Sequence, residues 1–481
     1  MAGFVGLAVL LIAAALLRPV DHDESQYVAA AVLSGQGLLP YRDFGYFQTP
    51  LYPLLFAPLV WATGHWAWPT LRVANALLGV ATAALIYDGA VQAGASRRAA
   101  LVCSALFATT GVFFFCFTVA RNDAVPAALL AGAIALIVRG KDGSSPVQAF
   151  AIGGILAAAG ACKISYAVPA AAYGAWTLAK SGRRPVWVAL GAVAPALLVA
   201  WTWAEAPEAF WFDVIGFPAR APAEYYAGQP WKLSLGGRLV DFLKFASLGA
   251  CLPVAVLAVL NRKRGALPVL EMLCVAGVVA ALIPAPTWRQ YLMPALPPLF
   301  VLAAVRLTGT RPSRSWQAFA AVCVVAGALE LGVQFGSGAM SFPTAIREGG
   351  RLREGLDRAH VVGPVASLSP QFVSLAGFGI APAFAPGPFY FRSATLLDRD
   401  AEQRLRLMSG RRPDLHGIGA IVVGGESPAT SGNADLDERL ARLAQDRGWI
   451  GRPILKTHFR LFTPPVQDGQ QGVYQEFTRP R

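Results

Sequence analysis

An acidic cluster carries the densest set of side chains that could do chemistry. Residues Asp21-His22-Asp23-Glu24-Ser25-Gln26-Tyr27 follow directly after the first apolar segment. Three carboxylates within four residues repel one another, so they must be solvated or paired. One of them could accept a proton from a hydroxyl group or help to hold a cation. The same letters suit the start of a helix, where acidic residues favour the positive end of the helix dipole. The two interpretations are compatible, and the local sequence leaves both open.

Further candidates interrupt apolar sequence: Arg121-Asn122-Asp123, Lys163 and Arg289-Gln290-Tyr291. A charged group at such a position is costly unless it faces a cavity or a partner, and a lysine or arginine there could neutralise a phosphate. The alternatives are helix capping by Asp123, snorkelling of Lys163 to the interface, and interfacial anchoring by Arg289 and Tyr291. Arg42 and Asp43 complete the polar set.

A metal site has weaker support. His22 and His65 share the first long loop and could join Asp23 or Glu24 on a metal ion, but their spacing is unspecific. We therefore predict no resident metal and no certain cofactor, although a divalent cation is compatible with the acidic cluster. The six cysteines all fall in apolar segments, without the spacing of a zinc site or a disulfide framework.

The composition places these residues in a membrane protein. The 481 residues are 55% hydrophobic and only 14% charged, with a mean hydropathy of +0.48. Soluble domains are about 25% charged, so the composition excludes a soluble enzyme, a disordered chain and a nucleic-acid-binding protein. The net charge of +13 is a topology signal, because many basic residues stand in short loops between apolar segments.

The chain is predicted to be an all-α polytopic membrane protein of about eleven transmembrane helices. A spanning helix needs roughly 20 predominantly apolar residues. The candidate segments are 3–17, 70–91, 99–118, 124–138, 148–162, 164–179, 186–204, 245–260, 267–285, 289–306 and 316–336. Three isolated acids near or within them are attributed to helix packing or interfacial exposure: Asp88, Glu271 and Glu330.

Basic residues in alternate short loops set the expected orientation. They are Arg97, Arg98, Arg139, Lys141, Lys180, Arg183, Arg184, Arg262, Lys263, Arg264, Arg306, Arg311 and Arg314, and Asp142 is the acid among them. These loops are expected to be cytoplasmic, together with the N-terminus, although Arg18 after the first segment departs from the pattern. The first segment is expected to be an uncleaved anchor. The chain is thus predicted to be a multi-pass protein of the cell (inner) membrane.

Two parts are predicted: a transmembrane domain, 1–339, with outer loops at 18–69 and 205–244, and an extracytoplasmic α/β domain, 340–481. Within the first outer loop we expect a short helix at 23–34 and an interfacial helix at 51–61. In the α/β domain we expect strands at 361–368, 420–423 and 453–462 and a helix at 436–445.

In order and spacing, residues 1–305 resemble the GT-C superfamily of polytopic glycosyltransferases. The likeness is to the family-39 type, which includes protein O-mannosyltransferases, and to the aminoarabinose transferases of lipid A. The motifs that carry it are Asp23-Glu24 with Tyr27 and Gly35, Pro40-Tyr41-Arg42-Asp43-Phe44, Gln48-Thr49-Pro50-Leu51, Leu71 to Gly79, Ala120-Arg121-Asn122-Asp123, and Arg289, Tyr291, Pro294 and Pro297. The chain departs from the pattern at Gln48, where some members place a lysine that meets the donor phosphate.

The resemblance implies a membrane-bound hexosyl- or pentosyltransferase. Such enzymes transfer a sugar, with inversion, from a polyprenyl-phosphate donor to a lipid, polysaccharide or protein acceptor. It implies Asp23 as general base, with Glu24 or Asp123 shaping the site. Lys163 and Arg289 would stabilise the leaving phosphate, and the other substrate-binding candidates are Tyr27, Arg42, Asp43, Arg121 and Tyr291.

The partners expected are the lipid-linked sugar donor, a glycan, lipid or protein acceptor, and membrane lipids, with no nucleic acid. The main alternative is a transporter or flippase of a lipid-linked or other amphipathic substrate. Transporters often have repeated halves and polar groups near the midplane, whereas the acids here gather on one side. A structural membrane protein, or an oligosaccharyltransferase or glycan ligase of the same superfamily, are further alternatives.

Overall fold

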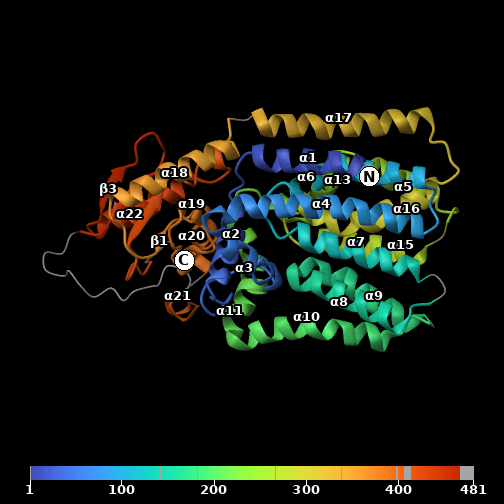
Figure 1. Ribbon diagram of the computed structural model, residues 1–481, viewed down its shortest axis with the longest axis horizontal. Coiled ribbons are helices and arrows are strands. Elements are labelled where there is room, and N and C mark those ends of the chain that lie inside the picture. The colour runs from blue at the N-terminus through green and yellow to red at the C-terminus, as the bar shows by residue number, and fades with distance from the viewer. Residues whose placement is uncertain are drawn as a thin grey trace.

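The computed structural model consists of a long helical bundle with a smaller mixed domain at one end (Figure 1). It describes residues 2–140, 143–180, 182–265, 267–336, 338–396, 399–405 and 413–465. We call the bundle end beside this domain the domain end and the opposite one the far end. The candidate residues for a reaction site lie at the domain end.

Helices run along the length of the bundle. They are α1 (Ala2–Leu17), α4 (Ala67–Gln92), α7 (Ala124–Arg139), α8 (Pro146–Cys162), α9 (Ala167–Ala179), α10 (Pro185–Glu205), α15 (Pro268–Leu282), η5 (Arg289–Ala295), α16 (Leu296–Leu307) and α17 (Arg314–Gly336). All eleven predicted segments are helical over most of their length. Among the described residues, four helices are long and apolar enough to cross a membrane, or six if each bent pair is one span. The number of spans therefore stays a prediction.

Two of the predicted spans are bent rather than straight. Helices α5 (Arg97–Ala108) and α6 (Gly111–Phe117) meet at 68°, and α13 (Leu235–Ser247) and α14 (Cys251–Leu260) meet at 95°. The two breaks contact each other, because the Gly111 N–H donates to the Leu248 carbonyl at 2.8 Å. Gly249 has a φ of +104°, and a Cβ there would lie 2.4 Å from the Thr109 carbonyl, so glycine is required at this crossing.

The basic loops gather at the far end of the bundle (Figure 1). The Ser96 N–H donates to the Thr308 hydroxyl at 3.0 Å, which joins two of these loops. Two others meet where the Arg184 guanidinium donates to the Ser144 carbonyl at 2.8 Å. Lys141 and Asp142, part of the predicted pattern, lie outside the described residues. The predicted orientation requires these loops to share one side, and they do.

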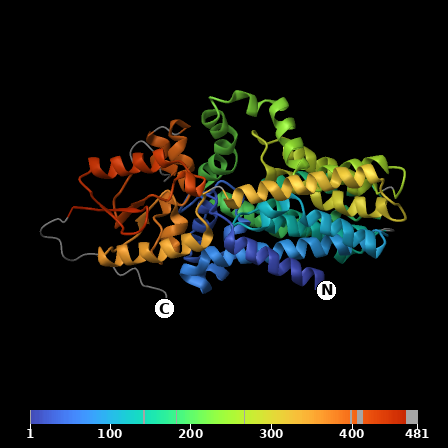
Figure 2. The same ribbon diagram turned by 90° about the horizontal axis from the view of Figure 1, so that it is seen from above.

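Both helices expected in the first long loop are present. Helix α2 (Glu24–Gly35) matches the prediction for 23–34, and α3 (Leu51–Thr63) matches that for 51–61. The second long loop, 205–244, is more helical than expected: it holds α11 (Pro207–Trp211), a π-helical turn η3 (Phe212–Gly216), α12 (Phe217–Tyr225) and most of α13. Figure 2 shows this green segment rising beside the junction between bundle and domain.

The smaller domain is a four-stranded sheet with helices on both faces. The strands are β1 (Val365–Ala366), β2 (Ala420–Val423), β3 (Ile450–Pro453) and β4 (Arg460–Thr463), in the order β1-β2-β4-β3. Strand β1 is parallel to β2, whereas β4 is antiparallel to both β2 and β3. Ile421 and Val423 pack against α22 (Ala434–Asp446), and Ala420 and Val422 face α18 (Phe342–Arg358) and α19 (Pro370–Leu375).

The prediction for this domain was right in class and wrong in detail. Strand 420–423 and the helix at 436–445 are confirmed. The single strand expected at 453–462 is wrong: β3 ends at Pro453 and β4 begins at Arg460, and the two pair as a hairpin. Lys456, with a φ of +61°, lies in the turn between them. The strand expected at 361–368 is reduced to two residues.

One hydrophobic core crosses the junction between the two predicted domains. Trp68 of α4 packs edge-on against Phe342 and Phe372 at 4.9 and 5.3 Å between ring centroids. Val28 and Leu33 of α2 belong to the same buried cluster. The predicted boundary at 339/340 falls between α17 and α18, but the domain is packed firmly onto the loop that carries the acidic cluster.

Candidate functional site

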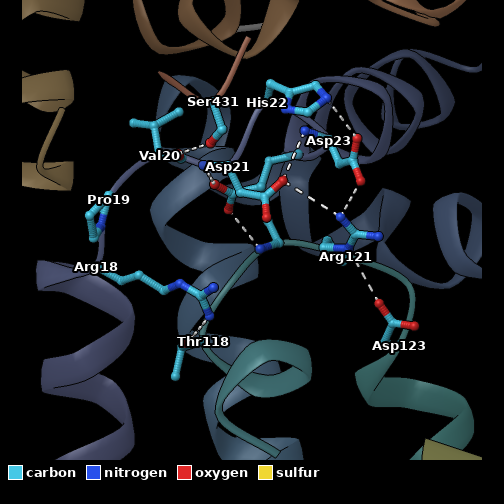
Figure 3. Close-up of polar contacts among 12 residues, drawn as sticks. Arg18, Pro19, Val20, Asp21, His22, Asp23, Thr118, Arg121, Asp123 and Ser431 are labelled. Atoms are coloured by element: carbon cyan, nitrogen blue, oxygen red, sulfur yellow. Dashed lines mark hydrogen bonds and ion pairs between the residues drawn. The ribbon is translucent and has the colours of Figure 1, made fainter. Parts of the chain in front are cut away.

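The acidic cluster lies between α1 and α2, and the small domain holds its backbone in place. The Val20 N–H donates to the Met340 carbonyl at 2.9 Å, and the Ser431 hydroxyl donates to the Val20 carbonyl at 3.2 Å. Figure 3 shows Ser431 above this loop, on the side opposite to Arg121. The position of the cluster therefore depends on the domain as well as on the bundle.

The capping interpretation is confirmed for the position of both candidate aspartates but not for their hydrogen bonds. Asp23 and Asp123 occupy the N-cap positions of α2 and α7, yet neither side chain accepts a capping hydrogen bond. Both residues adopt right-handed helical backbone angles, whereas a capping aspartate is normally extended. Their carboxylates are turned to other partners.

Arg121 is the centre of the site and joins three carboxylates (Figure 3). Its guanidinium pairs with Asp23, with Asp21 at 3.5 Å and with Asp123 at 3.3 Å. The side chain is only 4% exposed, so these ion pairs are much less screened than surface pairs. The arrangement connects α2 to the turn before α7.

Lys163 extends this chain of charges. Its ammonium pairs with Asp123, and both side chains are buried. It lies 5.3 Å from the ring centroid of Tyr291, while the Arg121 guanidinium lies 5.7 Å from that of Tyr27. Snorkelling of Lys163 to the surface is therefore wrong. The sequence candidates Asp23, Arg121, Asp123 and Lys163 converge, with Tyr27 and Tyr291 beside them.

Asp23 is held in its ionised form. Burial raises the pKa of its carboxyl, but the charge of Arg121, supported by His22 and Arg392, more than offsets this and leaves the pKa below its ordinary value. The His22 Nε2 lies 3.1 Å from the Asp23 carboxylate. Asp23 is also among the more accessible members of the cluster, with 25% of its side chain exposed, against 1% for Asp123.

Glu24 points away from Asp23 and into the protein, where it can shape the site but is closed to solvent. Its carboxylate is fully buried and accepts hydrogen bonds from Arg72 at 2.5 and 2.7 Å. It also accepts from the Trp68 indole at 3.0 Å and from the Ala120 N–H at 2.7 Å. These bonds, with Arg72 foremost, lower the Glu24 pKa although burial opposes this. Glu24 positions the backbone on either side of Asp23 and Arg121.

Arg289 lies near this cluster with a different partner. Its guanidinium pairs with Glu330 of α17 at 2.9 Å and lies 5.0 Å from the ring centroid of Phe115. The Arg121 guanidinium lies 5.0 Å from the same ring, so Arg289 belongs to the same region of the bundle. Arg18 lies 5.1 Å from that ring centroid. The sequence prediction missed Arg18, because an arginine after an apolar segment suits an interfacial anchor.

Arg42 and Asp43 form a separate group. Arg42 is exposed and pairs with Asp43 at 2.9 Å and with Glu205 at 3.2 Å. Asp43 also accepts a hydrogen bond from the Leu39 N–H at 2.8 Å. Arg42 lines a surface cavity of about 260 Å³ together with Glu205, Glu208 and Arg404. Arg42 thus lies at this surface cavity, and the expected role of Arg42 and Asp43 in substrate binding stays a prediction.

A divalent cation has one candidate position among the described residues. Asp21, His22 and Asp23 each offer a ligand atom, all within 4.8 Å of one another. The oxygen and nitrogen donors suit several divalent metals, but Arg121 already neutralises Asp23, which lowers the attraction for a second cation. His65 belongs to another site: it lies in η1 (Gly64–Trp66) and contacts Trp66.

The small domain adds one cation that the sequence did not reveal. The Arg392 guanidinium stacks on Tyr225 at 4.4 Å and on Phe389 at 4.5 Å. It is near enough to help lower the pKa of Asp23. Tyr225 of loop 205–244 therefore meets the small domain at the edge of the site.

Comparisons with known proteins bear on the fold. No protein-family model and no curated protein matches the chain. Two crystal structures of ArnT from Cupriavidus metallidurans do, at 15% identity over 97% of this chain and 99% of theirs. The TM-score is 0.58 for the apo state and 0.54 for the complex with undecaprenyl phosphate. The chain has the fold of ArnT.

This result confirms the expected fold class, a helical bundle of membrane-protein type with a small α/β domain. A third structure, an oligosaccharyltransferase from Archaeoglobus fulgidus in complex with zinc and sulfate, aligns at 12% identity over 90% of this chain and 70% of its own, with a TM-score of 0.47. The ArnT structures align over the bundle and the small domain alike, whereas the sequence resemblance ended at residue 305. The small domain is thus part of the shared fold.

Proposed function

We propose that the protein is a membrane glycosyltransferase that uses a polyprenyl-phosphate-linked sugar as donor. The observation that carries the proposal is the buried chain of charges Asp23–Arg121–Asp123–Lys163 at the domain end of a bundle with the ArnT fold. It combines one accessible carboxylate with cations at the depth where a lipid phosphate would lie. One of the two ArnT structures holds bound undecaprenyl phosphate, which supports this class of donor.

Asp23 is the candidate general base. The acceptor hydroxyl would attack the anomeric carbon from the face opposite to the phosphate, and its proton would pass to the Asp23 carboxylate. The bond from the anomeric carbon to the phosphate oxygen breaks, and the electron pair leaves with the polyprenyl phosphate. Base catalysis of this kind is worth about 10²–10⁴-fold.

The lowered pKa of Asp23 limits how it can act. A carboxylate with a lowered pKa is ionised and ready to accept a proton but is a weaker base, because efficiency follows the pKa of the base. Proton transfer is therefore expected late, after departure of the phosphate has made the attacking oxygen more acidic. Most of the acceleration must then come from cations that stabilise the leaving phosphate.

Lys163, Arg121 and Arg289 are the candidates for that stabilisation. Each is cationic and lies within or beside the Arg121 cluster. Asp123 acts as a positioning residue, since its two oxygens fix Lys163 and Arg121 relative to each other. Glu24 is also a positioning residue, because it accepts a hydrogen bond from the Ala120 N–H next to Arg121.

The proposed setting is the cell membrane, with the domain end on the extracytoplasmic side. The gathering of basic loops at the far end supports this orientation. The acceptor would then approach from outside, between the small domain and loop 205–244.

Mass spectrometry of cell-envelope glycans tests the proposal directly. Cells without the gene should lack one defined sugar on one class of glycan, lipid or protein. Complementation with the wild-type gene should restore it, and Asp23→Asn should not. The control is Glu208→Gln, which alters an exposed pair with Arg404 and should restore the sugar fully. Full restoration by Asp23→Asn would remove the base assignment, and transport of a lipid without sugar transfer would favour the transporter alternative.

A further inference from the structure

Three guanidinium groups surround one aromatic ring at the domain end. Those of Arg18, Arg121 and Arg289 lie 5.1, 5.0 and 5.0 Å from the ring centroid of Phe115. They come from the end of α1, the turn before α7 and the start of η5, so only the fold brings them together. Clustered cations repel one another, and the cost grows as water is excluded. Such a cluster needs anions.

The three arginines are neutralised unequally. Arg121 has carboxylate partners of its own, and Arg289 has Glu330. Arg18 is 7% exposed, and its acceptors are uncharged: the Thr118 hydroxyl at 2.7 Å, the Phe114 carbonyl at 3.2 Å and the Gln334 side-chain oxygen at 3.3 Å. Within the described part of the chain, no carboxylate forms an ion pair with Arg18. A buried cation with only neutral acceptors favours an anionic ligand.

The carboxylate that pairs with Arg289 belongs to Glu330 of α17, at the edge of the bundle. Helix α17 runs along one side of the bundle (Figure 1), and only 17% of its most apolar stretch is buried. Glu330 and Gln334 lie one turn apart on it, and the Gln334 amide donates to the Glu330 carboxylate. The second Glu330 oxygen is buried without a donor. One carboxylate from α17 thus pairs with Arg289, whereas Arg18 feels the charges of Asp21 and Glu24 only at a distance and pairs with no carboxylate among the described residues.

We propose that Arg18 and Arg289 together form a binding site for a lipid phosphate, and that Glu330 fills the Arg289 half of it in the absence of the lipid. The inference rests on the proposed function and names Arg18 and Glu330 as parts of its donor site. A phosphate has several free oxygens and can accept from two guanidinium forks at once, which a single carboxylate in this place does not do. The phosphate would displace Glu330 from Arg289 and give Arg18 the direct anionic partner that Asp21 and Glu24 do not provide.

The position of the site selects a lipid over a soluble phosphate. Glu330 and Gln334 belong to a helix whose outward face is apolar, with Val325, Leu329 and Val333 exposed. An anion that meets Arg289 at this helix would have its apolar part in the bilayer beside α17. We take the occupant to be the polyprenyl phosphate of the donor, which leaves its sugar pointing towards Arg121 and Asp23.

If Glu330 competes with the lipid phosphate for Arg289, removing the charge of Glu330 should strengthen lipid binding. Glu330→Gln keeps the shape and the bond from Gln334 but removes the charge that competes for Arg289. Binding of undecaprenyl phosphate should become about tenfold tighter. Arg18→Gln should weaken it by about tenfold or more, which corresponds to about 1.4 kcal/mol. A purely structural role for Glu330 would instead predict a lower melting temperature and weaker binding.

The experiment uses the full chain in lipid nanodiscs and measures binding of undecaprenyl phosphate by native mass spectrometry, with phosphatidylglycerol as the second lipid. The control is Glu271→Gln, which alters a similar pair with Arg306 at the far end and should change neither affinity. Tighter binding of undecaprenyl phosphate to Glu330→Gln, without a matching gain for phosphatidylglycerol, supports the proposal. An equal gain for both lipids overturns the donor assignment, because the site then selects any anionic lipid.

Two further results separate this inference from the proposed function. Unchanged or weaker binding by Glu330→Gln, while Asp23→Asn still abolishes transfer, would overturn the inference and leave the function standing. If lipid binding shifts as expected but the wild-type protein transfers no sugar, the proposed function would be overturned and the lipid-phosphate site would stand. If Arg18→Gln fails to fold, the Glu330→Gln result decides.

Discussion

The carboxylate of Glu24 and the guanidinium of Arg72 form an ion pair in which both side chains are wholly removed from solvent. Arg72 also donates to the carbonyls of Ala15 at 2.8 Å and Arg18 at 3.0 Å, at the end of α1. Glu24 meanwhile accepts from the Ala120 N–H. The pair therefore fixes three backbone segments around Asp23: the end of α1, the start of α2 and the turn that carries Arg121.

Removing one member of this pair should destabilise the protein strongly. Glu24→Ala leaves the Arg72 charge buried without a carboxylate, and the loss of one partner from a buried pair typically costs about 3–5 kcal/mol. We expect a clear drop in the melting temperature in detergent. The matched control is Asp88→Asn, which breaks a largely exposed pair with Arg139 and should cost about 1 kcal/mol or less.

A second variant, Glu24→Gln, tests whether Glu24 acts only through the position of its neighbours. If Glu24 only positions its neighbours, the fraction of Glu24→Gln that folds should keep most of its affinity for donor and much of its activity. A variant with wild-type stability and no activity would contradict this and return Glu24 to the reacting groups.

Lys163 should matter for the donor more than for the acceptor. Lys163→Ala removes a buried cation next to Tyr291, and a hydrogen bond to a charged group is worth about 1.5–3 kcal/mol. We expect donor affinity to fall by roughly 10–150-fold, while the KM for the acceptor changes little. Binding can be measured with undecaprenyl phosphate. Lys180→Ala, at the far end and stacked on Trp176, is the control, and an unchanged donor affinity in Lys163→Ala would exclude the phosphate role.

The sequence predicted the elements of the fold better than their bends. Apolar segments and basic loops are local signals, so the helices and the gathering of basic loops could be expected from them. The bends at Thr109–Gly111 and Leu248–Gly249 could not, because each exists to fit the other. The β3–β4 hairpin was missed for a related reason: residues 454–459 contain none of the Asn-Gly or Asp-Gly dipeptides that identify a turn in sequence.

The site was predictable where a charge interrupts apolar sequence. Arg121, Asp123 and Lys163 are conspicuous for that reason, and the structure brings them together with Asp23. Arg18 was noted only as a departure from the pattern of basic loops, and Glu330 was attributed to helix packing or interfacial exposure. Their contacts with Phe115 and Arg289 come from other helices and could not be read from the local sequence. Arg42 and Asp43 lie in a motif of the resembling family, and their pairing with Glu205 through Arg42 could not be read from that motif.

The buried carboxyl group of Asp213 should make the stability of the folded protein depend on pH. Asp213 is fully buried between the first long loop, loop 205–244 and the small domain, where it accepts hydrogen bonds from the Tyr46 N–H at 2.7 Å and from the Tyr390 hydroxyl. Burial outweighs both bonds and raises its pKa to about 7. Its unfolded pKa is about 3.9, so its stabilising contribution is complete below about pH 4 and is lost as the pH rises through 7.

Asp213→Asn should remove this loss of stability at high pH. The amide oxygen can still accept a hydrogen bond without carrying a charge, so the variant should melt at least about 2 °C higher than the wild type at pH 8 and show less gain at pH 5. Burial also raises the pKa of Asp437 to about 7. Because this carboxyl group is unchanged in the variant, part of the pH dependence of the melting temperature should persist. Equal pH dependence of the melting temperature in variant and wild type would refute the role of Asp213.

The ionisation of Asp23 should be readable in the pH profile of transfer. In the wild type, Arg121 holds the pKa of Asp23 below its ordinary value, so kcat/KM should not fall between about pH 7 and 4.5 through this group. In Arg121→Gln the opposing effect of burial is no longer offset, the Asp23 pKa rises, and an acid limb should enter this range. Arg121→Lys keeps the charge and should restore a flat profile even if the rate stays low. Arg42→Gln, which alters an exposed pair, should leave the profile unchanged. A flat profile in Arg121→Gln would mean that ionised Asp23 is not required for the reaction, since the loss of its main cationic partner must raise its affinity for protons.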